Sequence, residues 1–433
     1  MRRSELEALI PDQGATYDVI VAGGGPAGIG AALAAASNGA KTLLLEARSA
    51  FGGVAALAMW MPMNRLLLDG GQRGGVQDLI VDKIRSFGED ASVTGRVDFI
   101  NGDGLDVHPD YLRLAILELL EERGCHYRLY SPVTEVLLDG VMVRGVGVAA
   151  KEGRQIFHSQ IVVDATGDGD VAFLAGAEMV EGREEDGRHM PVSLVFALAN
   201  VDVERALAWK KTNREAFESA IKEAADEGYA VAAWYSLDRT TIPGVVNVNN
   251  GAFVDIGNID GAKSSELTLA ERIGVRVAVD LVRLARAKQL PGLEDCYLMR
   301  TGAHVGVRDT RRIVGEYVVT LEDAREGTEF PDVVARKYGA IDANQLYIGE
   351  MRSGFGYPYR SLLPQGVENL LVAGRCGSAT FLGHAAGKSM GNMVALGQAA
   401  GTAAALCCAQ GVAPRELDVA LLQSTLRAMG AQI

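Results

Sequence analysis

The stretch YDVIVAGGGPAGIGAALAAASNGAKTLLLE, residues 17–46, decides the fold. Its first part, Asp18 to Ala22, is a β-branched apolar run, which predicts a strand buried on both faces of a parallel sheet. Three glycines then form a G-x-G-x-x-G turn: Gly23 allows the tight turn, Gly25 leaves room for a pyrophosphate, and Gly28 lets the next helix pack closely on the strand. The free N–H groups of that helix point at the phosphates, so the stretch predicts a dinucleotide site.

The remainder of the stretch completes the dinucleotide-binding unit. Residues 31–37 predict a small-residue helix that Gly39 ends, and residues 41–45 predict the second strand. Glu46 closes that strand about 20 residues past the turn, where a carboxylate accepts hydrogen bonds from both ribose hydroxyls. A 2′-phosphate would be repelled there, which disfavours NADP. Strand, turn, helix, strand and acid in this order are far more specific than the glycines alone.

Composition bounds the class of protein. A chain of 433 residues that is 48% hydrophobic can bury a large core and suggests two or three lobes. A formal charge of −13 with a pI near 5.1 argues against nucleic acid or an anionic membrane as a partner. The N-terminal residues lack the apolar segment of a signal peptide, so we expect a cytoplasmic protein. Homo-oligomer formation is left open.

The apolar run at 390–409 and the cysteines have simple structural interpretations. Asn392 and Gln398 interrupt the run, so we expect a buried helix and no membrane span. The five cysteines show no C-x-x-C pair and no zinc or iron–sulfur spacing. They predict free thiols in a reducing compartment and no metal site.

Several later segments return to the same predicted sheet. Residues 51–53 place two glycines where the chain would turn back under a cofactor, and residues 160–170 predict a further buried strand ending in a glycine turn. Strands expected at 126–129, 133–138 and 141–150 predict a β-meander. Residues 369–373 predict another buried strand, and a small-residue helix follows from near Ser389.

A composition shift near Pro191 marks a second lobe. The pattern predicts strands at 193–199, 231–236 and 245–256 and an amphipathic helix at 203–227. A capping box of Thr268 and Glu271 would start a long helix that reaches Lys288. We therefore expect an α/β fold: a discontinuous Rossmann-like domain, 1–190 and 341–433, with a central parallel sheet and β-meander, and an inserted mixed α+β substrate lobe, 191–340.

Several segments together carry a more specific resemblance. They are GGGPAG (23–28), Glu46, GG (52–53), DATGDGD (164–170), GVRDTRRIVGEY (306–317), YPYRSLLP (357–364), NLLVAGRCGSA (369–379) and LGQAAGTAAA (396–405). The chain resembles the FAD-dependent oxidoreductases of the glutathione reductase-like superfamily. Within it, the chain looks like the FAD-oxidoreductase family related to the flavoprotein part of heterodisulfide reductase. The iron–sulfur cysteines of that flavoprotein are missing here, so electron bifurcation and disulfide reduction are not supported.

The resemblance implies bound FAD and redox chemistry at flavin N5. Arg375 stands where many superfamily members have an aspartate, and it either neutralises the pyrophosphate or pairs with a carboxylate. The helix starting near Ser389 would face a flavin carbonyl. The predicted cofactor-binding residues are Gly23, Gly25, Pro26, Ala27, Gly28, Glu46, Ala47, Arg48, Gly52, Gly53, Val133, Ala165, Thr166, Gly167, Gly374, Arg375, Gly391 and Asn392.

The candidate catalytic residues are His384, Arg308 and Arg311. Oxidation of an alcohol or amine by hydride transfer needs a base, and His384 lies between the last strand and the glycine-rich helix. Arg308 and Arg311, with Arg312, have a spacing that suits a bidentate clamp on a carboxylate. The alternatives are a structural histidine, and ion pairs of the arginines with nearby acids.

The predicted function is an FAD-dependent oxidoreductase that transfers a hydride between a small organic substrate and flavin N5. The sequence leaves open the substrate, covalent attachment of FAD, and whether the electron acceptor is oxygen, a quinone, a nicotinamide or a protein. Two alternatives belong to other classes: a non-catalytic binding protein with the FAD fold, and an NAD-consuming enzyme that resembles thiazole synthases.

Overall fold

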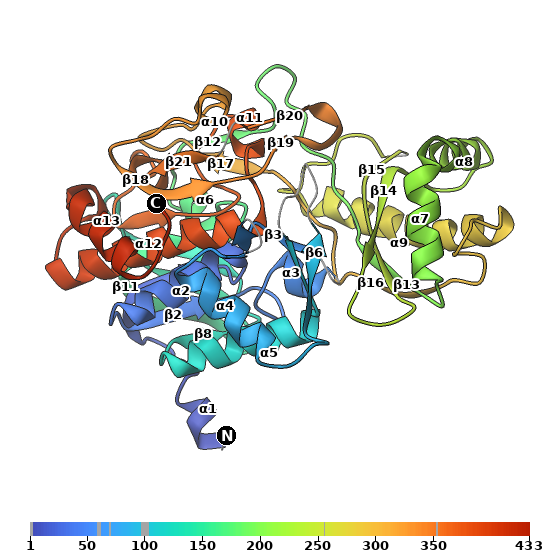
Figure 1. Cartoon of the computed structure of the whole chain (residues 1–433). Coiled ribbons are helices and arrows are strands. Elements are labelled where there is room, and N and C mark those ends of the chain that lie inside the picture. Colours follow the sequence, from blue (N-terminus) through green and yellow to red (C-terminus); the bar gives the residue numbers. More distant parts are fainter. Residues whose placement is uncertain (1–2, 59–61, 69–70, 97–103, 255, 352–353) are drawn as a thin grey trace.

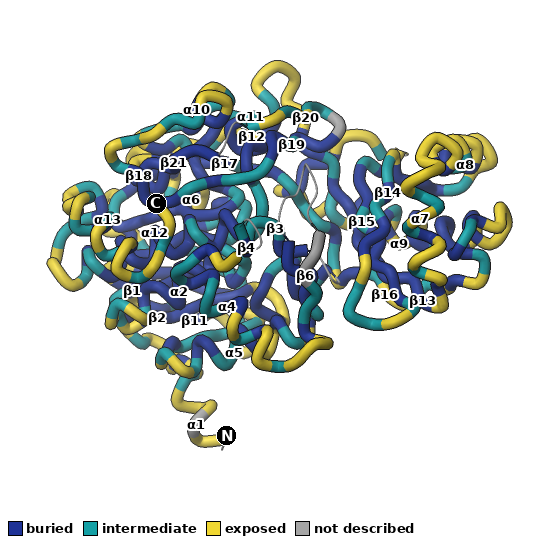
Figure 2. Tube along the Cα trace, in the orientation of Figure 1, coloured by how far each residue is buried: buried dark blue, intermediate teal, exposed yellow. Residues whose placement is uncertain are grey.

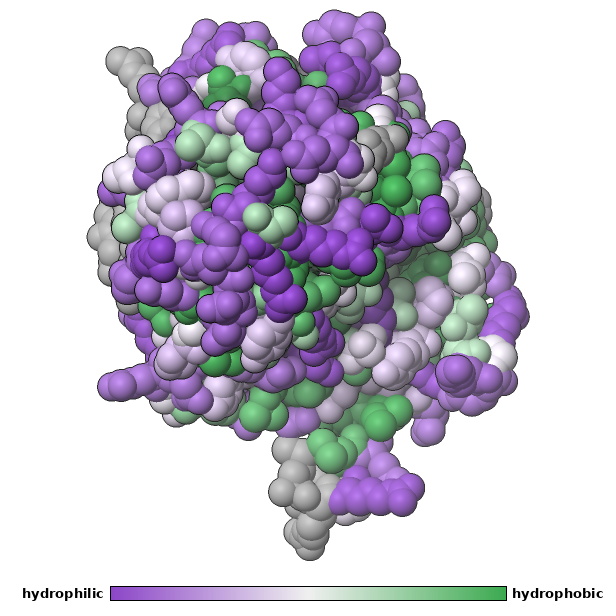
Figure 3. Space-filling view, turned by 90° about the vertical axis from the view of Figure 1, so that its right-hand side faces the viewer, coloured by the Kyte–Doolittle hydropathy of each residue, from purple (hydrophilic) through white to green (hydrophobic). Residues whose placement is uncertain are grey.

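The computed structural model describes the whole chain except residues 1–2, 59–61, 69–70, 97–103, 255 and 352–353 (Figure 1). The chain forms a larger lobe from its N-terminal and C-terminal parts and a smaller lobe from its middle part (Figure 1). Both lobes have a buried interior with exposed loops and helix ends at the periphery (Figure 2). The face on the side of the smaller lobe is largely hydrophilic, with scattered apolar side chains (Figure 3).

A parallel sheet forms the centre of the larger lobe. Its strands β8 (His126–Arg128), β2 (Thr42–Leu45), β1 (Thr16–Ala22), β11 (Gly153–Asp164) and β22 (Leu370–Val372) lie side by side in that order. Every neighbouring pair among them is parallel. β1 has four consecutive fully buried residues at its end, as expected for a strand covered on both faces. The predicted α/β class with a parallel sheet is confirmed.

A β-meander continues from the long strand β11. The first half of β11 pairs antiparallel with β10 (Met142–Ala150), which pairs antiparallel with β9 (Val133–Asp139). The stretch 126–129, expected as a strand of this meander, instead forms β8 at the far edge of the parallel sheet, where His126 pairs with Leu43. This segment is short and of mixed polarity, so its sequence does not indicate which neighbouring strand it pairs with.

Two small-residue helices pack closely in the larger lobe. They are α2 (Pro26–Ser37) and α12 (Met390–Gln410). A Cβ added at Gly397 would lie 1.9 Å from the carbonyl oxygen of Ala27, so only glycine allows this approach. α12 begins after Ser389, as predicted. Among the described residues it is the one helix long and apolar enough to cross a membrane, but 78% of its most apolar window is buried inside the protein, as in many core helices.

The smaller lobe contains an antiparallel sheet with helices. Its strands are β14 (Ala232–Arg239), β15 (Val246–Phe253), β13 (Phe196–Ala199) and β16 (Tyr297–Thr301), in that spatial order. Its helices are α7 (Val203–Thr212), α8 (Arg214–Asp226) and α9 (Ser264–Ala287). They share one buried apolar cluster with the sheet, which runs from Val192 to Val305. The domain boundaries at 190/191 and 340/341 stay a prediction.

Two helix predictions in this lobe are wrong. The single helix expected at 203–227 is broken at Asn213, whose φ of −123° and ψ of 41° are not helical. The long helix begins at Ser264, one turn before the expected capping box. Thr268 donates its hydroxyl back to the Ser264 carbonyl, and Glu271 accepts a hydrogen bond from the Val305 amide, so neither residue caps α9.

The remaining elements connect these layers. They are α1 (Arg3–Glu7), α3 (Val54–Leu57), β3 (Pro62–Asn64), β4 (Leu67–Leu68), β5 (Gly71–Gln72), α4 (Val76–Arg85), β6 (Ser92–Arg96), β7 (Gly104–Val107), α5 (Pro109–Glu122), α6 (Asp170–Leu174), β12 (Met179–Glu181), β17 (Arg311–Ile313), α10 (Leu321–Glu326), β18 (Val333–Lys337), β19 (Ile341–Asp342), η1 (Asn344–Leu346), β20 (Ile348–Gly349), β21 (Phe355–Pro358), η2 (Tyr359–Leu362), α11 (Phe381–Ala385), η3 (Pro414–Glu416) and α13 (Val419–Ala428). β17 pairs with β12, which brings the chain back to the larger lobe.

Candidate active site

A large cavity lies between the two lobes. Its volume is about 1330 Å³, above the range of about 300–1,000 Å³ that is usual for a single small ligand. Residues 45–48, 131–133 and 165–168 line it from the larger lobe, and residues 233–237 line it from the smaller one. One continuous space therefore joins the predicted dinucleotide turn to the predicted substrate lobe.

The glycine turn has the shape that a dinucleotide requires. Gly23 has a φ of +95°, and a Cβ there would lie 2.4 Å from the Ala165 carbonyl oxygen. A Cβ on Gly28 would lie 1.7 Å from the Gly23 carbonyl oxygen, so Gly28 closes the turn. A Cβ on Gly25 would meet no protein atom within 4 Å, and Gly25 lines the cavity. The backbone at Gly25 is thus open to a ligand at the start of α2.

Glu46 lies at the end of β2 and lines the cavity. One carboxylate oxygen accepts a hydrogen bond from the Gly24 amide at 2.7 Å, and the other accepts one from the Arg48 amide at 2.8 Å. These two bonds fix the carboxylate beside the glycine turn. Each oxygen keeps a lone pair that can accept a further hydrogen bond, which fits ribose binding.

Most of the predicted cofactor residues share this cavity. Besides Gly23, Gly25 and Glu46, the lining includes Pro26, Ala27, Ala47, Arg48, Gly53, Val133, Ala165, Thr166, Gly167, Gly374 and Arg375. The guanidinium of Arg375 pairs with Asp168 at 2.8 Å, so the carboxylate partner considered for it is present and itself lines the cavity.

Four predicted cofactor residues do not line the cavity: Gly28, Gly52, Gly391 and Asn392. A Cβ on Gly28 would lie 1.7 Å from the Gly23 carbonyl oxygen, and a Cβ on Gly52 would lie 2.5 Å from the Cβ of Ala56. A Cβ on Gly391 would lie 2.0 Å from the Arg65 carbonyl oxygen. These three glycines therefore serve close packing of the chain.

The side chain of Asn392 is fully used within the protein. Its Oδ1 accepts a hydrogen bond from Arg73 at 2.7 Å, and its Nδ2 donates to the carbonyls of Tyr338 and Gly387, both at 2.8 Å. The side chain is completely buried. Asn392 joins α12 to two neighbouring loops, so its side chain offers no free group to a flavin, and its predicted role as a flavin contact stays a prediction.

The predicted arginine clamp is not formed. Arg308 lines the cavity, and its Nη2 donates to Ser193 Oγ and to the Asn250 carbonyl, both at 3.2 Å. Arg311 is outside the cavity lining: it pairs with Asp170, and its guanidinium carbon lies 4.3 Å from the centre of the Phe173 ring. Arg312 is buried and donates to backbone carbonyls. Only Arg308 is placed to meet a substrate.

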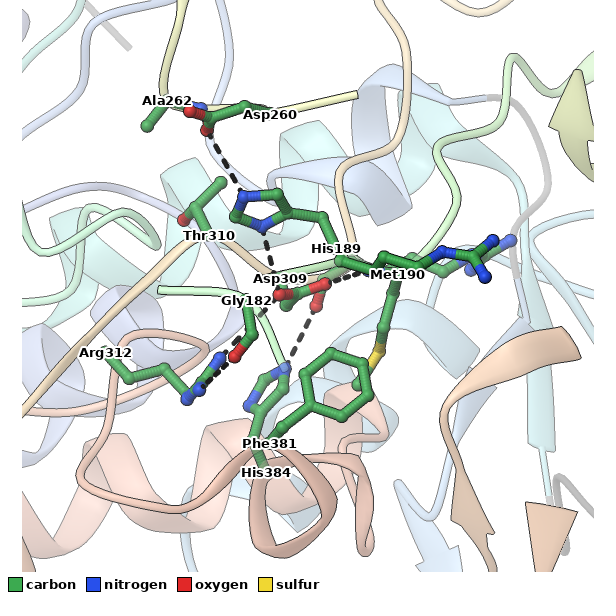
Figure 4. Close-up of polar contacts among 12 residues, drawn as sticks. Gly182, His189, Met190, Asp260, Ala262, Asp309, Thr310, Arg312, Phe381 and His384 are labelled. Carbon is green, nitrogen blue, oxygen red and sulfur yellow. Dashed lines mark hydrogen bonds and ion pairs between the residues drawn. The ribbon is translucent and has the colours of Figure 1, made fainter. Parts of the chain in front are cut away.

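His384 lies in the cavity wall on α11. Its Nε2 lies 3.0 Å from the Arg308 carbonyl oxygen, and since a carbonyl only accepts, Nε2 carries the proton (Figure 4). Burial holds the pKa of His384 well below its ordinary value, and the nearby Arg312 lowers it further. His384 is therefore neutral at pH 7, with Nδ1 as a hydrogen-bond acceptor.

Sequence reasoning missed the pair formed by Lys388 and Asp342. Both residues line the cavity, and Lys388 Nζ lies 2.9 Å from a carboxylate oxygen of Asp342. Burial lowers the pKa of Lys388, although Asp342 counteracts part of this effect. A signal existed, because Lys388 is a single charge within the otherwise uncharged stretch 376–409. Asp342 gave no comparable signal.

A histidine lies between acidic groups beside this wall. His189 Nδ1 lies 3.3 Å from Asp309 and its Nε2 lies 3.8 Å from Asp260 (Figure 4). Glu181, His189 and Asp260 are close enough together for a cation, but Lys263 already pairs with Asp260 at 3.1 Å. The predicted absence of a metal site stays a prediction.

The comparisons with known proteins agree with this geometry. The family described as FAD dependent oxidoreductase matches residues 18–426. Among curated proteins, no sequence matches this chain significantly. The p-nitrophenol 4-monooxygenase of Pseudomonas putida is similar in structure, with a TM-score of 0.52 and 14% identity over 95% of this chain and 84% of that chain. A geranylgeranyl bacteriochlorophyll reductase-like protein of Thermoplasma acidophilum has a TM-score of 0.50 and 16% identity over 96% of this chain and 84% of that chain.

At such identities the two solved structures show the fold alone, which is that of flavoproteins with a Rossmann-type FAD domain. The family match carries more weight because it covers nearly the entire chain, including the glycine turn, Glu46 and the last strand. This chain therefore belongs to the FAD-dependent oxidoreductase family and is an enzyme whose cofactor is FAD.

Proposed function

We propose that this oxidoreductase transfers a hydride between a small organic substrate and FAD. The observation that supports the proposal is the single cavity of about 1330 Å³, which runs from the glycine turn to polar side chains of the other wall. Its size leaves room for a substrate beside a dinucleotide. FAD supplies a two-electron acceptor and donor at its N5 atom, and the protein's part is to bind, orient and exclude water.

The cavity lining offers groups for both halves of FAD. The turn at Gly23 and Gly25 and the carboxylate of Glu46 would hold the pyrophosphate and the adenosine ribose. Gly374 and Arg375 line the cavity beside Ala27 and Gly167, and the flavin half would extend from there toward Ser389 at the start of α12. The negatively charged Glu46 favours a ribose without a 2′-phosphate.

His384 is proposed to orient the substrate. It is neutral, its Nε2 proton is held by the Arg308 carbonyl, and Nδ1 can accept a hydrogen bond from a substrate O–H or N–H group. A pKa far below neutrality makes it a weak proton acceptor in the resting protein. Its contribution to the reaction is thus mainly positioning, with proton transfer favoured only as the substrate group becomes more acidic.

A spectrum and a reduction assay test the proposal. The purified protein should be yellow, and acid precipitation should release FAD into the supernatant. Under anaerobic conditions, one class among alcohols, amines and acids should bleach the flavin absorbance. Colourless protein would favour the non-catalytic FAD-fold alternative, and an NAD-derived adenylate in the supernatant would favour the thiazole-synthase-like one. Yellow protein that no compound bleaches would refute hydride transfer from these classes.

Two finer statements also stand as proposals. A cytoplasmic location is supported by the five cysteines, all of which are free thiols, and cell fractionation tests it. A closer relation to the glutathione reductase-like flavoproteins and to the flavoprotein part of heterodisulfide reductase is supported by the sequence segments that suggested it. An alignment with those proteins that matches Arg375 and the segment 306–317 would test it.

A further inference from the structure

The guanidinium of Arg308 has unused hydrogen-bonding capacity inside the cavity. Its Nη2 donates to two neutral oxygens, Ser193 Oγ and the Asn250 carbonyl, and its buried Nε has no hydrogen-bond partner among the described residues. Among those residues no carboxylate forms an ion pair with it. Burying a charged group without a partner is costly, so the arrangement suits a ligand that supplies an anion.

Lys388 adds a second positive charge to the same part of the cavity. Arg308, Lys388 and Asp342 influence one another electrostatically, and Asp342 is the one carboxylate that pairs with Lys388 among the described residues. Asp309 also acts on Lys388, but Arg312 and His189 share that carboxylate. Two cations and one carboxylate leave this group with one excess positive charge.

The contacts of Arg308 place its positive charge beside the smaller lobe, which is the predicted substrate lobe. Its two acceptors belong to the smaller lobe, Asn250 being part of β15, and its guanidinium lies 5.8 Å from the centre of the Trp234 ring on β14. The carbonyl of Arg308 accepts the hydrogen bond from His384. Arg308 and His384 both line the cavity, so an anion bound by Arg308 would share it with the residue proposed to orient the substrate.

A second orphaned polar atom lies on the same wall. Ser389 follows Lys388, lines the cavity, and has a buried Oγ without a hydrogen-bond partner among the described residues. Arg308 Nε, Lys388 Nζ and Ser389 Oγ together offer N–H and O–H donors of the kind that a carboxylate's two oxygens accept.

We infer that Arg308 and Lys388 form a carboxylate-binding subsite, so that the substrate of this enzyme is a small organic acid. The inference rests on the proposed function, since it names the substrate class for that cavity. A single carboxylate matches the excess charge of one, and the planar guanidinium binds it through parallel hydrogen bonds. The chemistry at the other end of the acid would be oxidation of an alcohol or amine: the C–H bond would give its hydride to FAD, the O–H or N–H bond would give its proton to solvent, and a C=O or C=N bond would form.

Isothermal titration of the FAD-loaded protein at pH 7 tests the subsite. The probes are acetate and benzoate, each compared with its neutral isostere, acetamide or benzamide. We expect at least one carboxylate to bind with a stoichiometry of one, at least about tenfold more tightly than its amide. Arg308→Gln and Lys388→Gln should each weaken that carboxylate at least about tenfold and leave amide binding unchanged.

Arg360→Gln is the matched control, because Arg360 carries the same group but pairs with Asp332, and neither residue lines the cavity. It should bind the carboxylate like the unmodified protein. The inference is overturned if neither carboxylate binds, if the amides bind equally well, or if Arg308→Gln binds as tightly as the control. The affinities for acid and amide are compared on the unmodified protein, so this comparison tests the subsite even if a variant fails to fold. The FAD content, read from absorbance, reports separately on the proposed function.

Discussion

Replacing Gly25 by alanine should separate folding of the chain from binding of its cofactor. Gly25 has a φ of −74° and a ψ of −175°, which any residue adopts, and a Cβ there meets no protein atom within 4 Å. The added methyl group therefore costs the folded protein nothing. Because alanine has fewer unfolded conformations than glycine, the apoprotein should gain about 0.4–1 kcal/mol in its free energy of unfolding.

The same methyl group projects into the cavity at the start of α2. It would hold the pyrophosphate away from the backbone N–H groups of the turn. A hydrogen bond to a charged group contributes about 1.5–3 kcal/mol, so losing one should raise the dissociation constant of FAD about 10-fold to 150-fold. Stability and affinity are thus expected to change in opposite directions.

The assay is titration of apoprotein with FAD, followed by the quenching of flavin fluorescence, together with urea unfolding of the apoprotein. Gly71→Ala is the control, since Gly71 is exposed and its nearest atom to a Cβ, Leu68 O, is at an ordinary 3.6 Å. Gly28→Ala is the contrast, because its Cβ would lie 1.7 Å from the Gly23 oxygen and should prevent folding. Unchanged FAD affinity in Gly25→Ala, or a destabilised apoprotein, would refute the assignment of this turn.

Three further predictions concern the catalytic wall, the lobe junction and the helix pair. His384→Ala should slow anaerobic flavin reduction about 10²-fold, as expected when a substrate loses its positioning group, while changing FAD affinity less than about tenfold. Equal rates would remove His384 from the reaction. The hydrogen bond to Asp309 raises the pKa of His189 in the folded protein. The protonated His189 therefore contributes its full stabilisation below the ordinary pKa of 6.5, and this contribution is lost as the pH rises through the higher pKa of the folded state. Melting temperatures between pH 5.5 and 8.5 should show this fall, and His189→Gln should abolish it. Gly397→Ala should lower the urea concentration at the midpoint of unfolding. Overpacking against Ala27 costs about 1–3 kcal/mol or more, which outweighs the gain of about 1 kcal/mol in helix propensity. A raised midpoint would contradict the packing argument.

The dinucleotide half of the structure could be predicted from sequence because its determinants are local. The strand β1, the turn and the helix α2 are adjacent along the chain. Gly23 is required by the carbonyl of Ala165, directly after β11, and Gly28 by the carbonyl of Gly23, while Gly25 leaves room for a ligand. The start of α12 after Ser389 was predictable for the same reason. By contrast, the sequence around Asn213 is amphipathic on both sides and has no proline or glycine, so the break between α7 and α8 left no local signal.

The arginines show where spacing misleads. Arg308, Arg311 and Arg312 are close in sequence, which suggested a common clamp. Residues 311–313 form strand β17, in which successive side chains point to opposite faces. Arg311 accordingly reaches Asp170, while Arg312 turns inward to the Gly182 and Ala379 carbonyls. The substrate wall is assembled instead from residues far apart in sequence, which no local pattern could group.

The segment that carries Arg308 links the chemistry of the two lobes. Asp309 is fully buried and accepts a hydrogen bond from the Met190 amide, and it also contacts His189 (Figure 4). On the one side Arg308 donates to the smaller lobe, and on the other its carbonyl holds His384 of the larger lobe. Arg308 is therefore held by both lobes, through its guanidinium on the smaller lobe and through its backbone carbonyl on the larger. Under the proposed function, this anchoring would keep a bound acid at a constant distance from the flavin, which is the condition that hydride transfer places on the protein.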